Sequence, residues 1–125
     1  MYEIHRTPLL VAAFVLAVGV AKPGWAQDAA HGETVFKVCA ACHAKDQTNR
    51  TGPGLQGVVG RTAGTALGFR FSRAMKQSGI VWDNKSLDAY LAAPQKAVPG
   101  NTMPYAGMKN YQDRVDLIAY LATLK

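Results

Sequence analysis

The chain has 125 residues, 49% of them hydrophobic, and a formal net charge of +6. This length provides for one small domain and leaves no room for a second. Its 14 lysines and arginines are interspersed with 8 acidic residues, a pattern that argues against nucleic-acid binding and favours protein partners with acidic docking surfaces.

The N-terminus has the features of a secretory signal peptide. Residues 9–21 form an uninterrupted apolar stretch, and Gly24 and Ala26 place small residues where a signal peptidase cleaves. The stretch is shorter than the roughly 20 residues of a membrane span. We therefore expect residues 1–26 to be cleaved off near Ala26 and residues 27–125 to be a monomeric periplasmic domain without stable membrane insertion. A retained membrane anchor is the alternative.

The first predicted helix runs from an N-cap at Asp28 to Cys39 and leads into the motif Cys39-Ala40-Ala41-Cys42-His43. Two thiols at this spacing can each add to one vinyl group of the same porphyrin, and the following histidine can ligate its iron. The motif therefore predicts one haem c, covalently bound through Cys39 and Cys42, with His43 as an iron ligand. Redox chemistry would then belong to the cofactor.

Other uses of a Cys-x-x-Cys pair need settings that are not visible in this sequence. A thioredoxin-like thiol switch needs a βαβ unit, and a zinc site needs a second pair of ligands, whereas the chain has two cysteines in total. A disulfide between Cys39 and Cys42 would close a loop too short to add much stability and would leave His43 without a role. We favour haem attachment over these three alternatives.

The remaining sequence predicts an all-α fold of four or so helices with long loops. Residues 43–70 are polar and rich in glycine, so we expect an irregular loop around a prosthetic group. Further helices are expected from Ser72 to Gln77, from Asp83 to Pro94, and from about Asn110 onwards. Apolar residues at helical spacing predict the core; they are Leu87, Tyr90 and Leu91 in the third helix, and Leu117, Tyr120, Leu121 and Leu124 in the last.

Short motifs follow one another in a fixed order along the predicted mature domain. They are Gly32 and Phe36, the haem-attachment motif, Thr51-Gly52-Pro53, Gly60-Arg61, Gly68-Phe69, Gly79-Ile80-Val81-Trp82, Tyr90-Leu91, Pro99-Gly100-Asn101-Thr102-Met103, Ala106-Gly107 and Asp116-Leu117-Ile118-Ala119-Tyr120-Leu121. With this set the chain resembles class I cytochrome c, in the branch of mitochondrial cytochrome c and bacterial cytochrome c2. The resemblance implies the class I cytochrome c fold, wrapped around one haem.

The resemblance also implies which residues surround the haem. The iron would be held by His43 and Met103, and the neutral, soft thioether favours ferrous iron. The alternative sulfur ligand is Met108, and packing is the alternative role for Met75 and Met108.

Four further residues are implied as neighbours of the haem and its ligands. The carbonyl of Pro53 would accept a hydrogen bond from the second ring nitrogen of the ligating histidine, and the hydroxyl of Tyr90 would point towards the ligating sulfur. Trp82 would donate a hydrogen bond to a haem propionate, and Arg61 would offset the charge of that carboxylate. For both aromatic residues, a place in the core alone is the alternative.

Three residues depart from the family's pattern. Phe71 stands where the mitochondrial branch usually has a tyrosine, Met75 where it often has an asparagine, and Asn101 replaces the usual threonine two residues before the expected ligand. The first two changes make the surroundings of the haem less polar, which we expect to alter its reduction potential.

The basic residues expected near the haem edge form a sparse ring. Its candidates are Lys37, Lys45, Arg50, Lys96 and Lys109. Val38 and Thr102 occupy positions where mitochondrial members carry lysine, so we expect weaker electrostatic steering and more apolar contacts.

The sequence thus predicts a soluble periplasmic one-electron carrier, not an enzyme, in a respiratory or photosynthetic chain. Its partners would be redox proteins such as a membrane oxidase, a cytochrome bc1-type complex, a reaction centre or a dehydrogenase. Two alternatives stay open. The chain could be the electron-accepting subunit of one periplasmic dehydrogenase, or, if Met103 does not hold the iron, an open-site haem peroxidase or gas sensor.

Overall fold

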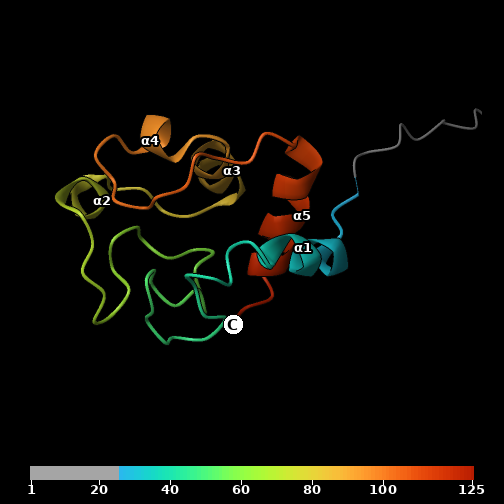
Figure 1. The fold of residues 1–125 in the computed structure, drawn as a ribbon, viewed down its shortest axis with the longest axis horizontal. Helices are drawn as coiled ribbons and strands as arrows, with labels where there is room; N and C mark the ends of the chain where they lie inside the picture. The colour runs from blue at the N-terminus through green and yellow to red at the C-terminus, as the bar shows by residue number, and fades with distance from the viewer. Residues whose placement is uncertain (1–25) are drawn as a thin grey trace, which may run out of the picture.

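The computed structural model of the chain describes residues 26–125. The predicted signal peptide, residues 1–26, lies outside the described residues except for Ala26. Five helices occupy the described part, in the order α1 (Ala29–Phe36), α2 (Arg73–Gln77), α3 (Asn84–Ala92), α4 (Pro94–Ala97) and α5 (Tyr111–Leu121) (Figure 1). Between residues 26 and 125 there is no strand, and one isolated bridge joins Thr62 to Val81. The all-α prediction is confirmed.

Four helices begin where the sequence indicates, and each has a side-chain N-cap. Asp28 accepts hydrogen bonds from the N–H groups of Ala30 and His31, and Ser72 accepts one from Met75. Asp83 forms a capping box with Ser86, and Asn110 accepts from Asp113. Each cap satisfies backbone donors that the first turn of a helix leaves without a partner.

Two boundaries differ from the prediction. The first helix ends at Phe36 rather than Cys39, because the N–H groups of Lys37 and Val38 bond to the carbonyls three residues back, which tightens the last turn. Pro94 ends α3 as predicted, but its fixed φ also suits the first position of a helix, so it starts the short α4.

The core forms where α1 and α3 pack against α5. Gly32 of α1 allows the close approach: a Cβ added to it would lie 2.0 Å from the carbonyl oxygen of Asp116 in α5. One turn later, the rings of Phe36 and Tyr120 meet with centroids 5.4 Å apart. These contacts join the two ends of the described chain, and the loop of residues 43–70 lies below α3 and to the left of α1 in Figure 1.

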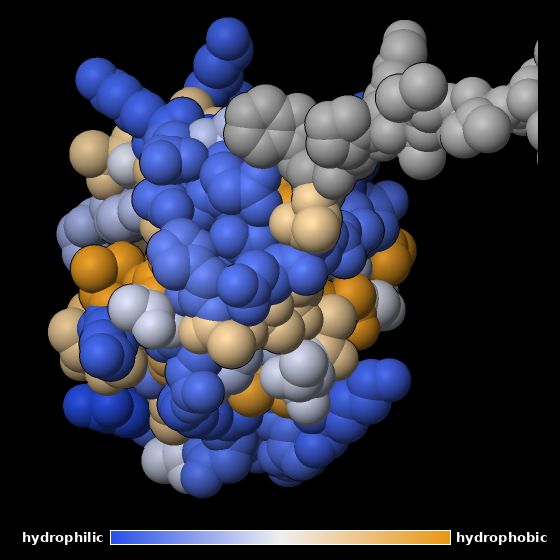
Figure 2. Space-filling view, turned by 90° about the vertical axis from the view of Figure 1, so that its right-hand side faces the viewer, coloured by the Kyte–Doolittle hydropathy of each residue, from blue (hydrophilic) through white to orange (hydrophobic). Residues whose placement is uncertain are grey.

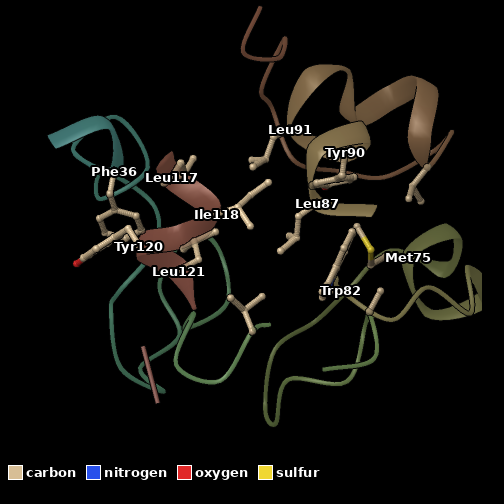
Figure 3. Packing of buried hydrophobic residues seen from close by; sticks show 13 residues of the cluster. Phe36, Met75, Trp82, Leu87, Tyr90, Leu91, Leu117, Ile118, Tyr120 and Leu121 are labelled. Carbon is tan, nitrogen blue, oxygen red and sulfur yellow. The ribbon is translucent and has the colours of Figure 1, made fainter. Parts of the chain in front are cut away.

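The buried hydrophobic side chains form one cluster with two sides (Figure 3). Phe36 and Tyr120 lie on one side, while Met75, Trp82 and Tyr90 lie on the other. Figure 2 shows the side of the molecule on which α1 and α5 lie, and its described surface is mostly hydrophilic. Within residues 26–125, no helix has the length and apolar character needed to cross a membrane.

Candidate cofactor site

A cavity of about 430 Å³ is lined by side chains from both sides of this cluster. Its walls come from the turn after α1, the loop of residues 43–70, α2, α3, the loop before α5, and α5 itself. All eight residues that the sequence singles out line it: Cys39, Cys42, His43, Pro53, Arg61, Trp82, Tyr90 and Met103. Most of the remaining wall is apolar, so the cavity suits a large apolar group with a few polar contacts.

Cys39 and Cys42 lie in the helical turn that follows α1. The N–H groups of Cys42 and His43 both bond to the carbonyl of Cys39, at 3.0 and 2.9 Å, and this turn brings the two thiols and the imidazole to the same cavity. Within residues 26–125, no disulfide joins the two cysteines. Burial, together with the neighbouring Cys42, raises the pKa of the Cys39 thiol.

The imidazole of His43 is held in one orientation by two neighbours. Its Nδ1 lies 2.8 Å from the carbonyl oxygen of Pro53. Because a carbonyl can only accept, Nδ1 carries the hydrogen, and Nε2 keeps a lone pair for a metal ion. Gly52 lies in close contact with the ring, since a Cβ there would be 2.3 Å from Cε1. An imidazole held in this way could bind haem iron through Nε2.

Met103 lies in the loop between α4 and α5, beside the hydroxyl of Tyr90. That hydroxyl is 3.9 Å from the Met103 sulfur and 3.4 Å from Oδ1 of Asn101. Burial raises the pKa of Tyr90 to about 12, so the phenol remains a hydrogen-bond donor at neutral pH. Met75 also lines the cavity, whereas Met108, the alternative ligand, is not among the lining residues.

Arg61 and Trp82 form part of the wall in different ways. The guanidinium of Arg61 donates to the carbonyls of Gln56 and Gly54, at 3.1 and 3.2 Å. Burial lowers the pKa of Arg61, and none of the ion pairs among residues 26–125 includes it. A partly buried cation without a carboxylate fits a cofactor that brings its own acidic groups. The ring of Trp82 packs against that of Tyr90, with centroids 5.0 Å apart.

Two members of the predicted basic ring make bonds within the chain. Nζ of Lys45 lies 2.7 Å from Oε1 of Glu33, and Arg50 donates to the carbonyl of Ala40 at 2.9 Å. The side-chain hydrogen bond from Lys45 lowers the pKa of Glu33. Val38, in the same region of the chain, is 65% exposed. Glu33 therefore offsets the positive charge of Lys45, whereas Arg50 keeps its charge because its partner is a neutral carbonyl.

Sequence reasoning gave no role to two residues that the structure places at this site. Gly52 was noted as part of a motif, but its contact with His43 depends on how the loop folds back. Asn101 was noted as a departure from a family pattern, and the structure shows it buried beside Met103. The signal in the sequence is an amide side chain, in place of the usual threonine, two residues before the expected ligand.

Comparison with known proteins gives consistent matches over the described part of the chain. Residues 29–125 match the family model described as "Cytochrome c". Cytochrome c2 of Rhodomicrobium vannielii is 49% identical over 100 residues, which cover 78% of this chain and 80% of that protein. Cytochrome c2 of Blastochloris viridis is 46% identical over 115 residues, which cover 90% of each.

A solved structure is also similar. Cytochrome cH from Methylobacterium extorquens superposes with a TM-score of 0.75 at 47% identity, covering 77% of this chain and 98% of that one.

Proposed function

Because this chain belongs to the cytochrome c family, whose members carry haem c, we propose that it is an exported one-electron carrier in which His43 and Met103 ligate the haem iron. The haem is covalently bound through the cysteine pair, Cys39 and Cys42. The observation that carries the proposal is the convergence of both cysteines, His43 and Met103 on one largely apolar cavity.

When bound, the haem supplies reversible one-electron chemistry at its iron. The residues of the chain prepare the site for that chemistry. Pro53 and Gly52 hold the imidazole of His43 so that Nε2 is free to bind a metal. Tyr90 places its hydroxyl 3.9 Å from the Met103 sulfur. Arg61 supplies a positive charge for a propionate, and Trp82 is the proposed donor to the same group.

Export to the periplasm is supported by the sequence before the domain. Residues 1–26 have the composition and cleavage pattern of a signal peptide, and the match to the family model begins only at residue 29. We propose that cleavage near Ala26 releases residues 27–125 as a monomeric, haem-bearing domain.

The proposed partners are redox proteins of a respiratory or photosynthetic chain. An excess of basic over acidic residues favours partners with acidic surfaces. His43 and Met103 would together hold the iron and leave no position for a substrate, so we propose electron transfer without enzymatic chemistry. The same arrangement would also suit an electron-accepting subunit of one dehydrogenase.

Carbon monoxide separates the carrier from an open-site haem protein. The ferrous protein, purified from the periplasmic fraction, is exposed to carbon monoxide and its visible spectrum is recorded. The proposal predicts that the spectrum is unchanged and that the protein cycles between its ferric and ferrous forms. Rapid binding of carbon monoxide would overturn the proposal in favour of a peroxidase or gas sensor. Stable co-purification with a dehydrogenase would identify a bound subunit instead of a free carrier.

A further inference from the structure

Asn101 is a buried polar residue whose side chain uses its full hydrogen-bonding capacity. It is 6% exposed and lies two residues before Met103. Nδ2 donates to the carbonyls of Pro94 and Val98, both at 2.9 Å. Oδ1 accepts from the N–H of Met103 at 3.0 Å and from the Tyr90 hydroxyl at 3.4 Å. An amide group has two donor hydrogens and two acceptor lone pairs, and all four are engaged.

These bonds also fix the orientation of the amide. Both carbonyl partners require a donor, and the N–H of Met103 requires an acceptor. With the oxygen and nitrogen exchanged, the two carbonyls would face an oxygen and the N–H would face an NH₂ group, so three bonds would be lost. The amide of Asn101 therefore has one orientation that satisfies its partners in the folded protein.

The four partners belong to different parts of the fold. Pro94 begins α4, Val98 follows its last residue, and Tyr90 belongs to α3. One amide thus ties the backbone of Met103 to both neighbouring helices. The Tyr90 hydroxyl, which lies 3.9 Å from the Met103 sulfur, is the second link from Asn101 to that side chain.

We infer that Asn101 is the positioning residue for Met103: its amide holds the Met103 backbone and the Tyr90 hydroxyl so that the sulfur faces the cavity. The inference rests on the proposed ligation of the haem iron by Met103. Asn101 itself acts through its neighbours and is not assigned as an iron ligand.

Few other side chains can replace this amide. A threonine hydroxyl has one donor hydrogen, so it can satisfy only one of the two carbonyls. An aspartate keeps the acceptor but loses both donors, and it places a charge in a buried site. An alanine loses every side-chain bond and leaves the N–H of Met103 without its partner, whereas the carbonyls of Pro94 and Val98 keep their bonds to backbone N–H groups.

The test compares Asn101→Ala with Gln95→Ala. Gln95 anchors the same loop through a bond of 2.8 Å to the carbonyl of Asn101, but it is exposed and does not line the cavity. Imidazole is titrated into the ferric holoprotein, where it must displace the Met103 sulfur to bind the iron. Loss of the amide removes hydrogen bonds that hold the Met103 loop closed, so Asn101→Ala should bind imidazole about tenfold more tightly or more. A tenfold change corresponds to about 1.4 kcal/mol, which is about the net contribution of one hydrogen bond. Gln95→Ala should change it by less than about twofold.

Two further measurements keep the outcome decisive. Asn101→Thr retains part of the network, so its affinity for imidazole should lie between those of the wild type and Asn101→Ala. In the wild-type protein, the amide hydrogen of Met103 should exchange slowly with solvent, because it is bonded to Oδ1. Wild-type affinity in Asn101→Ala, or in Asn101→Thr if the alanine variant does not mature, would overturn the inference, as would rapid exchange at Met103.

Failure of the inference can be told from failure of the proposed function. If Met103 is not the ligand, its replacement leaves the ferric spectrum of the protein unchanged. If Met103 is the ligand but Asn101 does not position it, replacing Met103 changes that spectrum while Asn101→Ala leaves the affinity for imidazole as in the wild type.

Discussion

Gly52 lies in contact with the imidazole of His43, and a Cβ added to it would be 2.3 Å from Cε1 and 2.6 Å from Nδ1. Gly52→Ala should therefore push the ring away from the carbonyl of Pro53. We expect a loss of about 2 kcal/mol in the free energy of unfolding and a changed reduction potential, because the ligand is displaced. Denaturant titration and potentiometry of the holoprotein measure the two effects.

Gly79→Ala is the control for this variant. Gly79 has a φ of +66° and no atom within 4 Å of an added Cβ, so the substitution costs about 1 kcal/mol through backbone strain alone. Its reduction potential should match that of the wild type. An unchanged potential in Gly52→Ala would show that the contact does not orient His43.

Gly32→Ala tests the packing of α1 on α5. Alanine favours a helix over glycine by about 1 kcal/mol, so propensity alone predicts a more stable protein. The structure predicts the opposite sign, because the new Cβ would lie 2.0 Å from the backbone oxygen of Asp116. We expect the free energy of unfolding to fall by about 2 kcal/mol. The control is Thr34→Ala, at an exposed position of the same helix, which should not lower the free energy of unfolding. Stabilisation by Gly32→Ala would refute the close contact.

His31 makes the contact between α1 and α5 sensitive to pH. Its Nδ1 lies 2.9 Å from Oδ2 of Asp116, whose side chain is 4% exposed. The hydrogen bond to Asp116 raises the pKa of His31 above its usual 6.5. Burial tends to raise the pKa of Asp116, but hydrogen bonds from the Asp28 N–H, His31 and Gln112 outweigh it, so this pKa is lowered.

The stability that His31 contributes should follow from these two directions. Because its folded pKa is raised, the contribution is fully present below pH 6.5 and is lost as the pH rises through the raised value. The contribution of Asp116 is present above its unfolded pKa of 3.8 and is lost as the pH falls through its lowered value. The difference in unfolding free energy between wild type and His31→Gln should therefore shrink from pH 6 towards pH 9. A pKa of His31 at or below 6.5 by NMR titration would contradict this.

Phe71 and Met75 both line the cavity, in agreement with the expectation that they make its surroundings less polar. Phe71→Tyr and Met75→Asn each add a polar group there. Since polar surroundings favour the more highly charged ferric state, we expect each variant to lower the reduction potential. Redox titration of the two variants checks this, and unchanged potentials in both would refute the role assigned to these residues.

The local features of the fold could be predicted because short-range chemistry determines them. Asp28, Ser72, Asp83 and Asn110 are helix caps whose bonds reach only two or three residues along the chain. The spacing within the Cys39–His43 motif likewise reflects one helical turn. Such features depend little on the rest of the molecule.

The contacts that orient the candidate ligands could not be predicted in this way. Gly52 meets His43 because the loop after the motif folds back, as the bond from the Gly52 N–H to the carbonyl of Cys42 shows. Asn101 acquires its four partners only when α3, α4 and the loop of Met103 are packed together. These relationships are tertiary, and no local pattern encodes them.

The ferric spectrum tests the central claim most directly. Sulfur ligation of ferric haem gives a weak far-red charge-transfer band, so the wild-type protein should show it and Met103→Ala should lack it. Met75→Leu and Met108→Leu are the controls, because these are the other methionines among the described residues, and both should keep the band. Loss of the band in Met108→Leu with retention in Met103→Ala, or absence of the band from the wild type, would contradict ligation of the iron by His43 and Met103.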